Sequence, residues 1–108
     1  MKTYPHPQLD DLPLAEVMQA LADPCRIAIV RTLLEADGRE LACGEFDLGV
    51  AKATCSHHFD VLRSAGIVAS RVEGTRCMTS LRKDEIETRF PGLLRLVAGE
   101  APARRRRR

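Results

Sequence analysis

The chain has 108 residues, the length of a single domain, and a net charge of +2. The last five residues, Arg104 to Arg108, are all arginine, and without them the 17 basic residues fall to 12 against 15 acidic ones. The rest of the chain therefore has a net charge of −3, which excludes a uniformly basic surface. Any affinity for nucleic acid must come from local basic positions or from the tail.

Cysteine spacing and the start of the chain indicate the compartment. The four cysteines are at least twelve residues apart, so the sequence has no CxxC pair for a metal or a redox reaction. The first thirty residues lack an apolar run behind a basic start, so we expect no signal peptide and no membrane partner. These features predict a cytoplasmic protein with reduced thiols.

Two helices are predicted in the first third of the chain, after an N-terminal arm at residues 1–12. The arm has two prolines and no hydrophobic period, with His6 as a lone histidine between them. Pro13 can open the first helix, and apolar residues then recur at helical spacing: Leu14, Val17, Met18 and Leu21. Asp23-Pro24 predicts a second helix running to about Ala36, with aspartate as N-cap and proline at the first position. We expect this second helix to be the most buried.

The centre of the chain, residues 48–66, predicts a helix with two distinct faces. Residues 39–47 are weakly helical and are expected to form the first helix of a helix-turn-helix. The second helix follows a turn at residues 48–51 and ends at Gly66, which suits a left-handed C-cap. Its inner face is mainly apolar: Cys55, His58, Phe59 and Leu62. Its outer face is small and polar, which favours contact with DNA: Ala53, Ser56, His57, Asp60 and Ser64.

A β-hairpin is predicted next, from strands at residues 67–72 and 75–81 joined by a Glu73-Gly74 turn. Arg71 and Arg76 lie near its tip, within reach of phosphates or a minor groove. Two short helices followed by a hairpin is the order of a winged helix-turn-helix. The predicted fold is therefore mostly α with a small β-hairpin wing, an α+β fold.

The last helical segment, residues 83–98, is interrupted by Pro91. Its apolar stripe exceeds the need of a small core: Ile86, Phe90, Leu93, Leu94 and Val97. We therefore expect a homodimer that packs through the first and last helices. Residues 13–98 form the predicted DNA-binding domain, and residues 99–108 form an Arg-rich tail.

Three stretches of the sequence resemble the ArsR/SmtB family of bacterial winged-helix repressors. They are ALADPCR at residues 20–26, SHHFDVLRSAGIV at residues 56–68 and EGTR at residues 73–76. The resemblance spans about residues 14–98. It implies a homodimer that binds a near-palindromic operator in double-stranded DNA, represses by default and is released by an effector.

The family has two familiar metal sites, and this chain retains only part of each. The site on the first helix of the motif needs a Cys-x-Cys pair, and residues 40–46 retain only Cys43. The site on the last helix needs Asp and His pairs, and no histidine follows His58. Both ligand sets are incomplete, so no metal site and no cofactor are predicted, although a metal effector is left open. Asp60 also stands where the family often has Lys or Arg, which puts one phosphate contact in doubt.

The candidate site residues fall into two groups. The predicted DNA contacts begin where the helix dipole is positive, at residues 52–54. They are Lys52, Ala53, Thr54, Ser56, His57, Arg63, Arg71 and Arg76. The candidates for effector or redox chemistry are Cys25, at a helix start that favours thiolate, and Cys43, before a surface turn. Cys55 and Cys77 are interpreted as small core residues, and His58 as a core histidine bonded to backbone.

The sequence thus predicts a dimeric DNA-binding repressor released by a thiol-reactive agent, a small molecule or a metal. The alternative is a winged-helix module that binds proteins and never touches DNA. Such a module would expose apolar residues on the outer face of the central helix, where this chain has polar ones. No spacing of nucleophile and base and no phosphate loop points to an enzyme.

Overall fold

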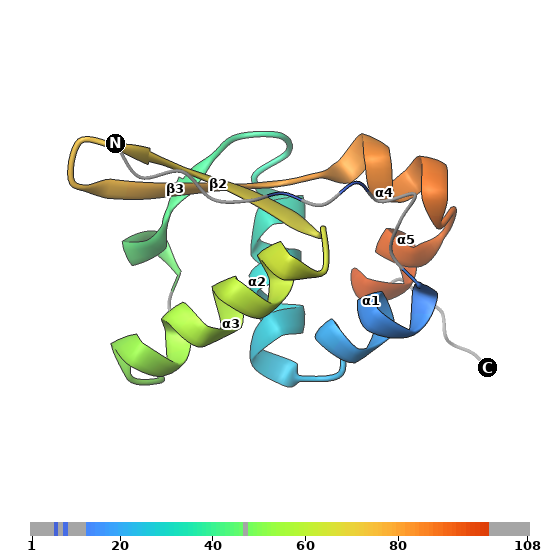
Figure 1. Ribbon diagram of the computed structural model, residues 1–108, viewed down its shortest axis with the longest axis horizontal. Helices are drawn as coiled ribbons and strands as arrows, with labels where there is room; N and C mark the ends of the chain where they lie inside the picture. The colour runs from blue at the N-terminus through green and yellow to red at the C-terminus, as the bar shows by residue number, and fades with distance from the viewer. Residues whose placement is uncertain (1–5, 7, 9–12, 47, 100–108) are drawn as a thin grey trace.

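The computed structural model describes residues 6, 8, 13–46 and 48–99 (Figure 1). Its elements in chain order are α1 (Leu14–Ala20), α2 (Pro24–Glu35), β1 (Leu41–Ala42), the 3-10 turn η2 (Cys43–Glu45), α3 (Lys52–Ser64), β2 (Val68–Glu73), β3 (Arg76–Leu81), α4 (Lys83–Arg89) and α5 (Leu93–Val97). The predicted fold class, helical with a small hairpin wing, is confirmed. No helix in this part of the chain is long and apolar enough to cross a membrane.

The central helix α2 begins as predicted. Asp23 Oδ1 accepts hydrogen bonds from the backbone N–H groups of Cys25, at 2.8 Å, and Arg26, at 3.3 Å, and Pro24 takes the first position. The helix packs against α3, β3 and α5. It buries Ile29, Val30 and Leu33 completely or nearly so. The local capping signal therefore places the helix on which the rest of the core is assembled.

The described strands form one antiparallel sheet in the order β1-β3-β2. The hairpin pairs Val68 with Leu81 at its base and Glu73 with Arg76 at its tip. The two-residue turn is therefore Gly74-Thr75, one residue later than predicted. Gly74 has a φ of +64°, and it stands at the position where a type II′ turn needs glycine.

The prediction of a helix over residues 39–47 is wrong. Residues 41 and 42 form strand β1, which pairs with Thr79 and Met78 of β3. One 3-10 turn follows, and the Glu45 carboxylate closes it by accepting a hydrogen bond from the Ala42 N–H at 2.7 Å. The partners on β3 satisfy backbone groups that a helix would otherwise have to satisfy locally, so this short segment is extended.

Most members of the apolar stripes of the first and last helices pack into the chain's own core, so only part of each stripe is available for the predicted dimer interface. Buried members of the two stripes are Val17, Leu21, Ile86, Leu94 and Val97. Leu14 and Met18 of α1 remain exposed, and so does Leu96 of α5, at 71% of its surface. In Figure 1, α1 and α5 lie together at one end of the molecule, and the hairpin tip and the first turn of α3 lie at the other.

The predicted boundaries of the arm and the tail fall almost entirely outside the described residues. Within the arm, the structure describes His6, whose Nε2 accepts a hydrogen bond from the Ser70 N–H at 3.0 Å. Ser70 lies on β2, one of the two edge strands of the sheet. The histidine thus satisfies a backbone donor that the sheet leaves open.

Candidate nucleic-acid interface

Helix α3 separates its two faces as the sequence predicts. His58, Phe59 and Leu62 are buried, and Phe59 meets Phe46 edge to face with ring centroids 5.1 Å apart. Cys55 is half-buried at the boundary between the faces. The outer residues are exposed: Ala53, Ser56, His57, Asp60 and Ser64. The core holds α3 by one face and leaves a small, polar face open.

The first turn of α3 is suited to an anion. Ala51 at the N-cap has an extended backbone and no side chain that can accept a hydrogen bond from the helix. The first N–H groups of a helix have no intrahelical acceptor, and the dipole is positive there. Lys52, Ala53 and Thr54 are all exposed around these donors. Backbone and side chain together can therefore bind a phosphate.

The two wing arginines differ in how firmly acids hold them. Arg71 Nε and Nη2 donate to Glu40 at 2.7 and 2.5 Å, and Nη1 donates to Glu73 at 3.2 Å. The hydrogen bond from Arg71 holds the pKa of Glu40 below its usual value, and hydrogen bonds to Glu40 and Glu73 raise the pKa of Arg71. Arg76 reaches Glu45 at 3.9 Å only, and 59% of its side chain is exposed. Arg76 is therefore the more available cation at the wing tip.

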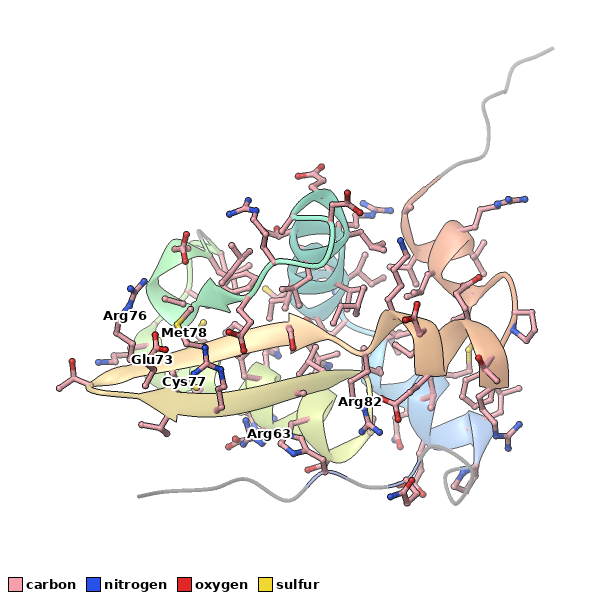
Figure 2. All side chains as sticks on the ribbon, turned by 90° about the horizontal axis from the view of Figure 1, so that it is seen from above. Arg63, Glu73, Arg76, Cys77, Met78 and Arg82 are labelled. Carbon is pink, nitrogen blue, oxygen red and sulfur yellow. The ribbon has the colours of Figure 1, made fainter. Side chains whose placement is uncertain are left out.

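Arg63 does not lie on the exposed face, contrary to its assignment as a DNA contact. Only 9% of its surface is exposed, and its guanidinium forms an ion pair with Asp60 one turn earlier on α3. Figure 2 shows Arg76 near the outer end of the hairpin and Arg63 set back toward the middle of the molecule. Arg63 is best described as a residue that fixes α3 within the fold.

His58 is a buried core histidine, as predicted, but its hydrogen-bond partner is a side chain and not the backbone. The Arg26 Nη1 lies 3.1 Å from His58 Nδ1, while Arg26 Nε donates to the Ala20 carbonyl at 2.6 Å. His58 Nε2 lies 3.9 Å from Asp23 Oδ1. This histidine thus connects α3 to the first turn of α2.

The four thiols have different surroundings. Burial is the largest cause that raises the pKa of the Cys43 thiol to about 11, and a hydrogen bond with Cys77 is the second. Burial also raises the pKa of Cys55. At neutral pH these shifts oppose the thiolate, the form that reacts, so they weigh against Cys43 as a redox sensor.

Cys25 belongs to a cluster that sequence reasoning missed. The donor atoms of Asp23, Cys25 and His58 all lie within 4.8 Å of one another. Asp23 and Cys25 are two residues apart, but His58 follows 33 residues later, a spacing that no metal-binding motif in the sequence indicates. Only the packing of α3 on α2 brings the three together.

A hollow of about 460 Å³ opens between α1 and α3 beside this cluster. Its polar lining includes Glu16, Arg26, His57 and Asp60. The hollow therefore adjoins the outer face of α3, where a small molecule could reach both helices.

Comparison with known proteins agrees with this geometry. The helix-turn-helix domain family matches residues 21–71. The HTH-type transcriptional regulator YceK of Bacillus subtilis is 43% identical over 89 residues, which are 81% of this chain and 88% of that protein. The chain belongs to the ArsR/SmtB family of winged helix-turn-helix transcriptional regulators.

Two further relatives of this ArsR/SmtB member carry names that refer to DNA binding and to repression. The solution structure of Mycobacterium bovis Mb0332, a homodimeric winged helix-turn-helix DNA-binding domain and possible ArsR-family regulator, is 30% identical with a TM-score of 0.63. It covers 79% of this chain and 77% of its own. The biofilm growth-associated repressor of Xylella fastidiosa is 33% identical over 76 residues, 64% of each chain. The relatives are regulators, so the alternative of a protein-binding module is not favoured.

Proposed function

We propose that the protein is a cytoplasmic, dimeric repressor without enzymatic activity that binds a near-palindromic DNA duplex and is released by an effector. One observation carries the proposal: the exposed, small and polar face of α3 begins at an uncapped helix start beside Lys52. This start lies at the same end of the molecule as the wing tip (Figure 1). The Mb0332 homodimer and the Xylella repressor support the assembly and the sign of regulation.

The proposed contacts divide by chemistry. Lys52, with the N–H groups of Ala53 and Thr54, binds phosphate at the start of α3. Ser56 and His57 follow on the exposed face and read base edges in the major groove. In the wing, Arg76 binds phosphate or enters the minor groove, with Arg71 as a weaker contributor because two carboxylates hold it. Arg63 is not part of this set because it is buried.

The proposed dimer uses the apolar side chains that the core leaves uncovered. Leu14, Met18 and Leu96 are 52%, 47% and 71% exposed. They lie on α1 and α5, at the end of the molecule away from the start of α3 (Figure 1). Pairing two chains there leaves one α3 per chain free, so two half-sites about 10 bp apart are expected. The domain at residues 13–98 supplies these contacts, with residues 1–12 and 99–108 as proposed arm and tail.

Selection from a pool of random duplexes tests this function, because it needs no knowledge of the regulated genes. The full chain should enrich a near-palindrome, and one dimer should occupy it in sedimentation. A variant with Ser56→Ala and His57→Ala is the matched control, because it keeps the fold and loses base readout. Failure to enrich any sequence, or binding by monomers to single asymmetric sites, would contradict the proposal.

A further inference from the structure

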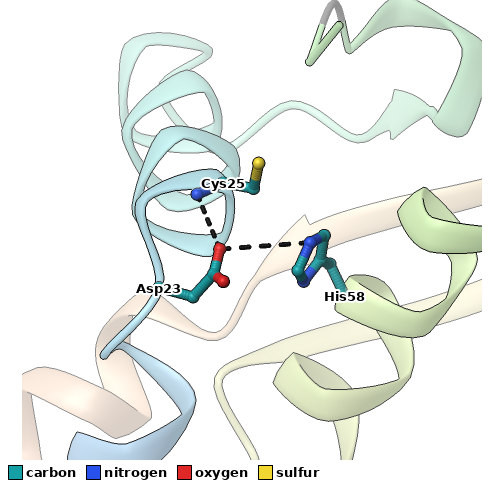
Figure 3. Close-up of side chains that lie close together, drawn as sticks. All are labelled: Asp23, Cys25 and His58. Atoms are coloured by element: carbon teal, nitrogen blue, oxygen red, sulfur yellow. Dashed lines mark hydrogen bonds and ion pairs between the residues drawn. The ribbon is translucent and has the colours of Figure 1, made fainter. Parts of the chain in front are cut away.

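Three side chains with different donor atoms meet where α2 begins against α3. Asp23 comes just before α2, Cys25 lies in its first turn and His58 faces them from α3 (Figure 3). The carboxylate oxygen, thiol sulfur and imidazole nitrogen lie within 4.8 Å of one another. Asp23 and Cys25 are half-buried, and His58 is buried. An ion between them would have protein on one side and an approach from solvent on the other.

The donor set selects the kind of ion. Thiolate, imidazole and carboxylate together suit a borderline-soft divalent cation such as Zn²⁺, whereas Mg²⁺ and Ca²⁺ prefer oxygen alone. Around a tetrahedral Zn²⁺ with bonds of about 2.0 to 2.3 Å, neighbouring donors are roughly 3.3 to 3.8 Å apart. His58 Nε2 lies 3.9 Å from one oxygen of the Asp23 carboxylate, Oδ1, so the imidazole and the carboxylate are already close enough to share one ion. We propose that Asp23, Cys25 and His58 form a three-ligand binding site for Zn²⁺ or a similar cation.

Asp23 can coordinate the ion while it still caps α2. Both backbone hydrogen bonds of the α2 cap are accepted by Asp23 Oδ1, so Oδ2 keeps its lone pairs for a cation. Partial burial acts to raise the pKa of Asp23, but the hydrogen bonds from Cys25 and Arg26 outweigh it and lower the pKa below its usual value. The carboxylate is therefore anionic at neutral pH. Cys25 must lose its proton on binding, so affinity rises with pH.

Arg26 competes with the ion for His58. An arginine can only donate, so His58 Nδ1 accepts the bond from Arg26 and the neutral ring keeps its proton on Nε2. A cation bound at Nε2 displaces that proton, and the neutral ring must then carry it on Nδ1. The Arg26–His58 hydrogen bond therefore breaks when the ion binds. The guanidinium can turn into the adjoining hollow, which Glu16 and Asp60 line.

The ion would join α2 to the helix that is proposed to read DNA. Its binding is therefore expected to change operator affinity, a consequence that rests on the proposed function. The metal site itself does not depend on that function, since it can be measured without DNA. The two claims can consequently fail separately.

The experiment is titration of the reduced, full-length chain with Co²⁺, a spectroscopic substitute for Zn²⁺, followed by Zn²⁺ competition. Wild type is expected to show a thiolate-to-cobalt charge-transfer band, tetrahedral d–d bands and release of a proton. Cys25→Ser and His58→Gln should weaken binding at least about tenfold, the smallest loss seen even for outer partners of a metal. Asp23→Asn should weaken it too while preserving the helix cap, because asparagine caps as well as aspartate.

Matched controls exist for each ligand type. Cys55→Ser and His57→Gln change the same kinds of side chain on α3 outside the cluster, and both should bind Co²⁺ like wild type. Arg26→Leu removes the competing donor and should tighten binding. If His58→Gln does not fold, Cys25→Ser and Asp23→Asn still decide the matter.

Absence of the charge-transfer band in wild type would overturn the proposal, and so would its persistence in Cys25→Ser. Bands that disappear with Cys43→Ser instead would place the ion elsewhere and also overturn it. Operator affinity measured with and without Zn²⁺ then tests the coupling. An unchanged affinity in a protein that binds both Zn²⁺ and DNA would refute the coupling and leave the site intact.

Discussion

Neighbouring residues on α3 differ in exposure, and therefore in role, because they lie on different faces of the helix. His57 and His58 are neighbours in sequence, yet His57 is exposed and His58 is 7% exposed, because each step along a helix rotates the side chain by about 100°. Asp60 and Arg63 show the same effect, since their ion pair joins an exposed position to a buried one. Residue type alone therefore does not tell a DNA contact from a structural residue.

Substitutions at the proposed phosphate contacts and at the proposed base contacts should affect DNA binding differently. Lys52→Ala and Arg76→Ala remove exposed cations, so binding should weaken on all duplexes and the log–log salt slope should fall by about 1 for each. Ser56→Ala and His57→Ala should alter sequence preference and leave the salt slope nearly unchanged. Fluorescence titrations on selected and random duplexes at several salt concentrations measure both quantities. Equal losses on both duplexes in all four variants would refute this division.

The buried thiol of Cys43 should make stability depend on alkaline pH. Its pKa is raised from 9.0 to about 11, so the folded state favours the protonated thiol. The stability contributed by this group is complete below pH 9.0 and is lost as the pH rises through about 11. Denaturant unfolding across this range should show a smaller decline for Cys43→Ser than for wild type. Parallel curves for the two proteins would argue against the shift.

At the scale of elements, a backbone hydrogen-bond motif determines where α3 ends. Its C-terminal end closes through two backbone hydrogen bonds, from Gly66 N–H to the Arg63 carbonyl and from Ile67 N–H to the Leu62 carbonyl, both at 3.0 Å. This pair is the Schellman motif, and it needs the positive φ of +77° that Gly66 adopts. Chain direction thus changes within two residues, from α3 into β2.

Gly66→Ala should destabilise the fold by about 1 to 2 kcal/mol, the cost of a left-handed conformation for a residue with a side chain. Gly44→Ala is the matched control, because Gly44 has no positive φ and a Cβ there meets nothing within 4 Å. The free energy of unfolding from urea titrations compares the two. Equal effects at both positions would show that the C-cap does not limit stability.

At the scale of the whole molecule, the proposed DNA-binding and dimerisation surfaces lie at opposite ends. The hairpin tip and the start of α3 form one end, and α1 and α5 form the other (Figure 1). The core between them is mainly aliphatic and is built around α2, which contacts α3, β3 and α5. A second chain bound through α1 and α5 would therefore leave the proposed DNA-binding end exposed.

Leu96→Glu should dissociate the proposed dimer. Each chain would lose the burial of one leucine, about 1.5 to 3 kcal/mol, and this loss occurs twice per dimer. The dissociation constant should then rise at least about 100-fold, which sedimentation over a concentration series measures. Val50→Glu is the control, because Val50 is also an exposed apolar residue, at 39%, but precedes α3 at the other end. Similar dissociation in both variants would place the interface elsewhere.

Local signals in the sequence determined much of the fold. Asp23-Pro24 predicted the start of α2, Gly66 predicted the end of α3, and hydrophobic period separated the faces of α3. Pro91 likewise divides the last helical segment into α4 and α5. Each of these features depends on residues within one or two turns of each other. Capping and helical periodicity act over this range, so the local sequence is sufficient to predict them.

Only the tertiary structure decided the features that depend on distant partners. Residues 41 and 42 become a strand because β3 offers hydrogen bonds to them, although their own sequence is too short to specify one. Arg63 is buried by the packing of its helix, whereas its sequence position suggested contact with DNA. Asp23 and Cys25 meet His58 because α3 packs across the start of α2. Sequence spacing does not record such contacts, since chain segments far apart are brought together by the burial of the core between them.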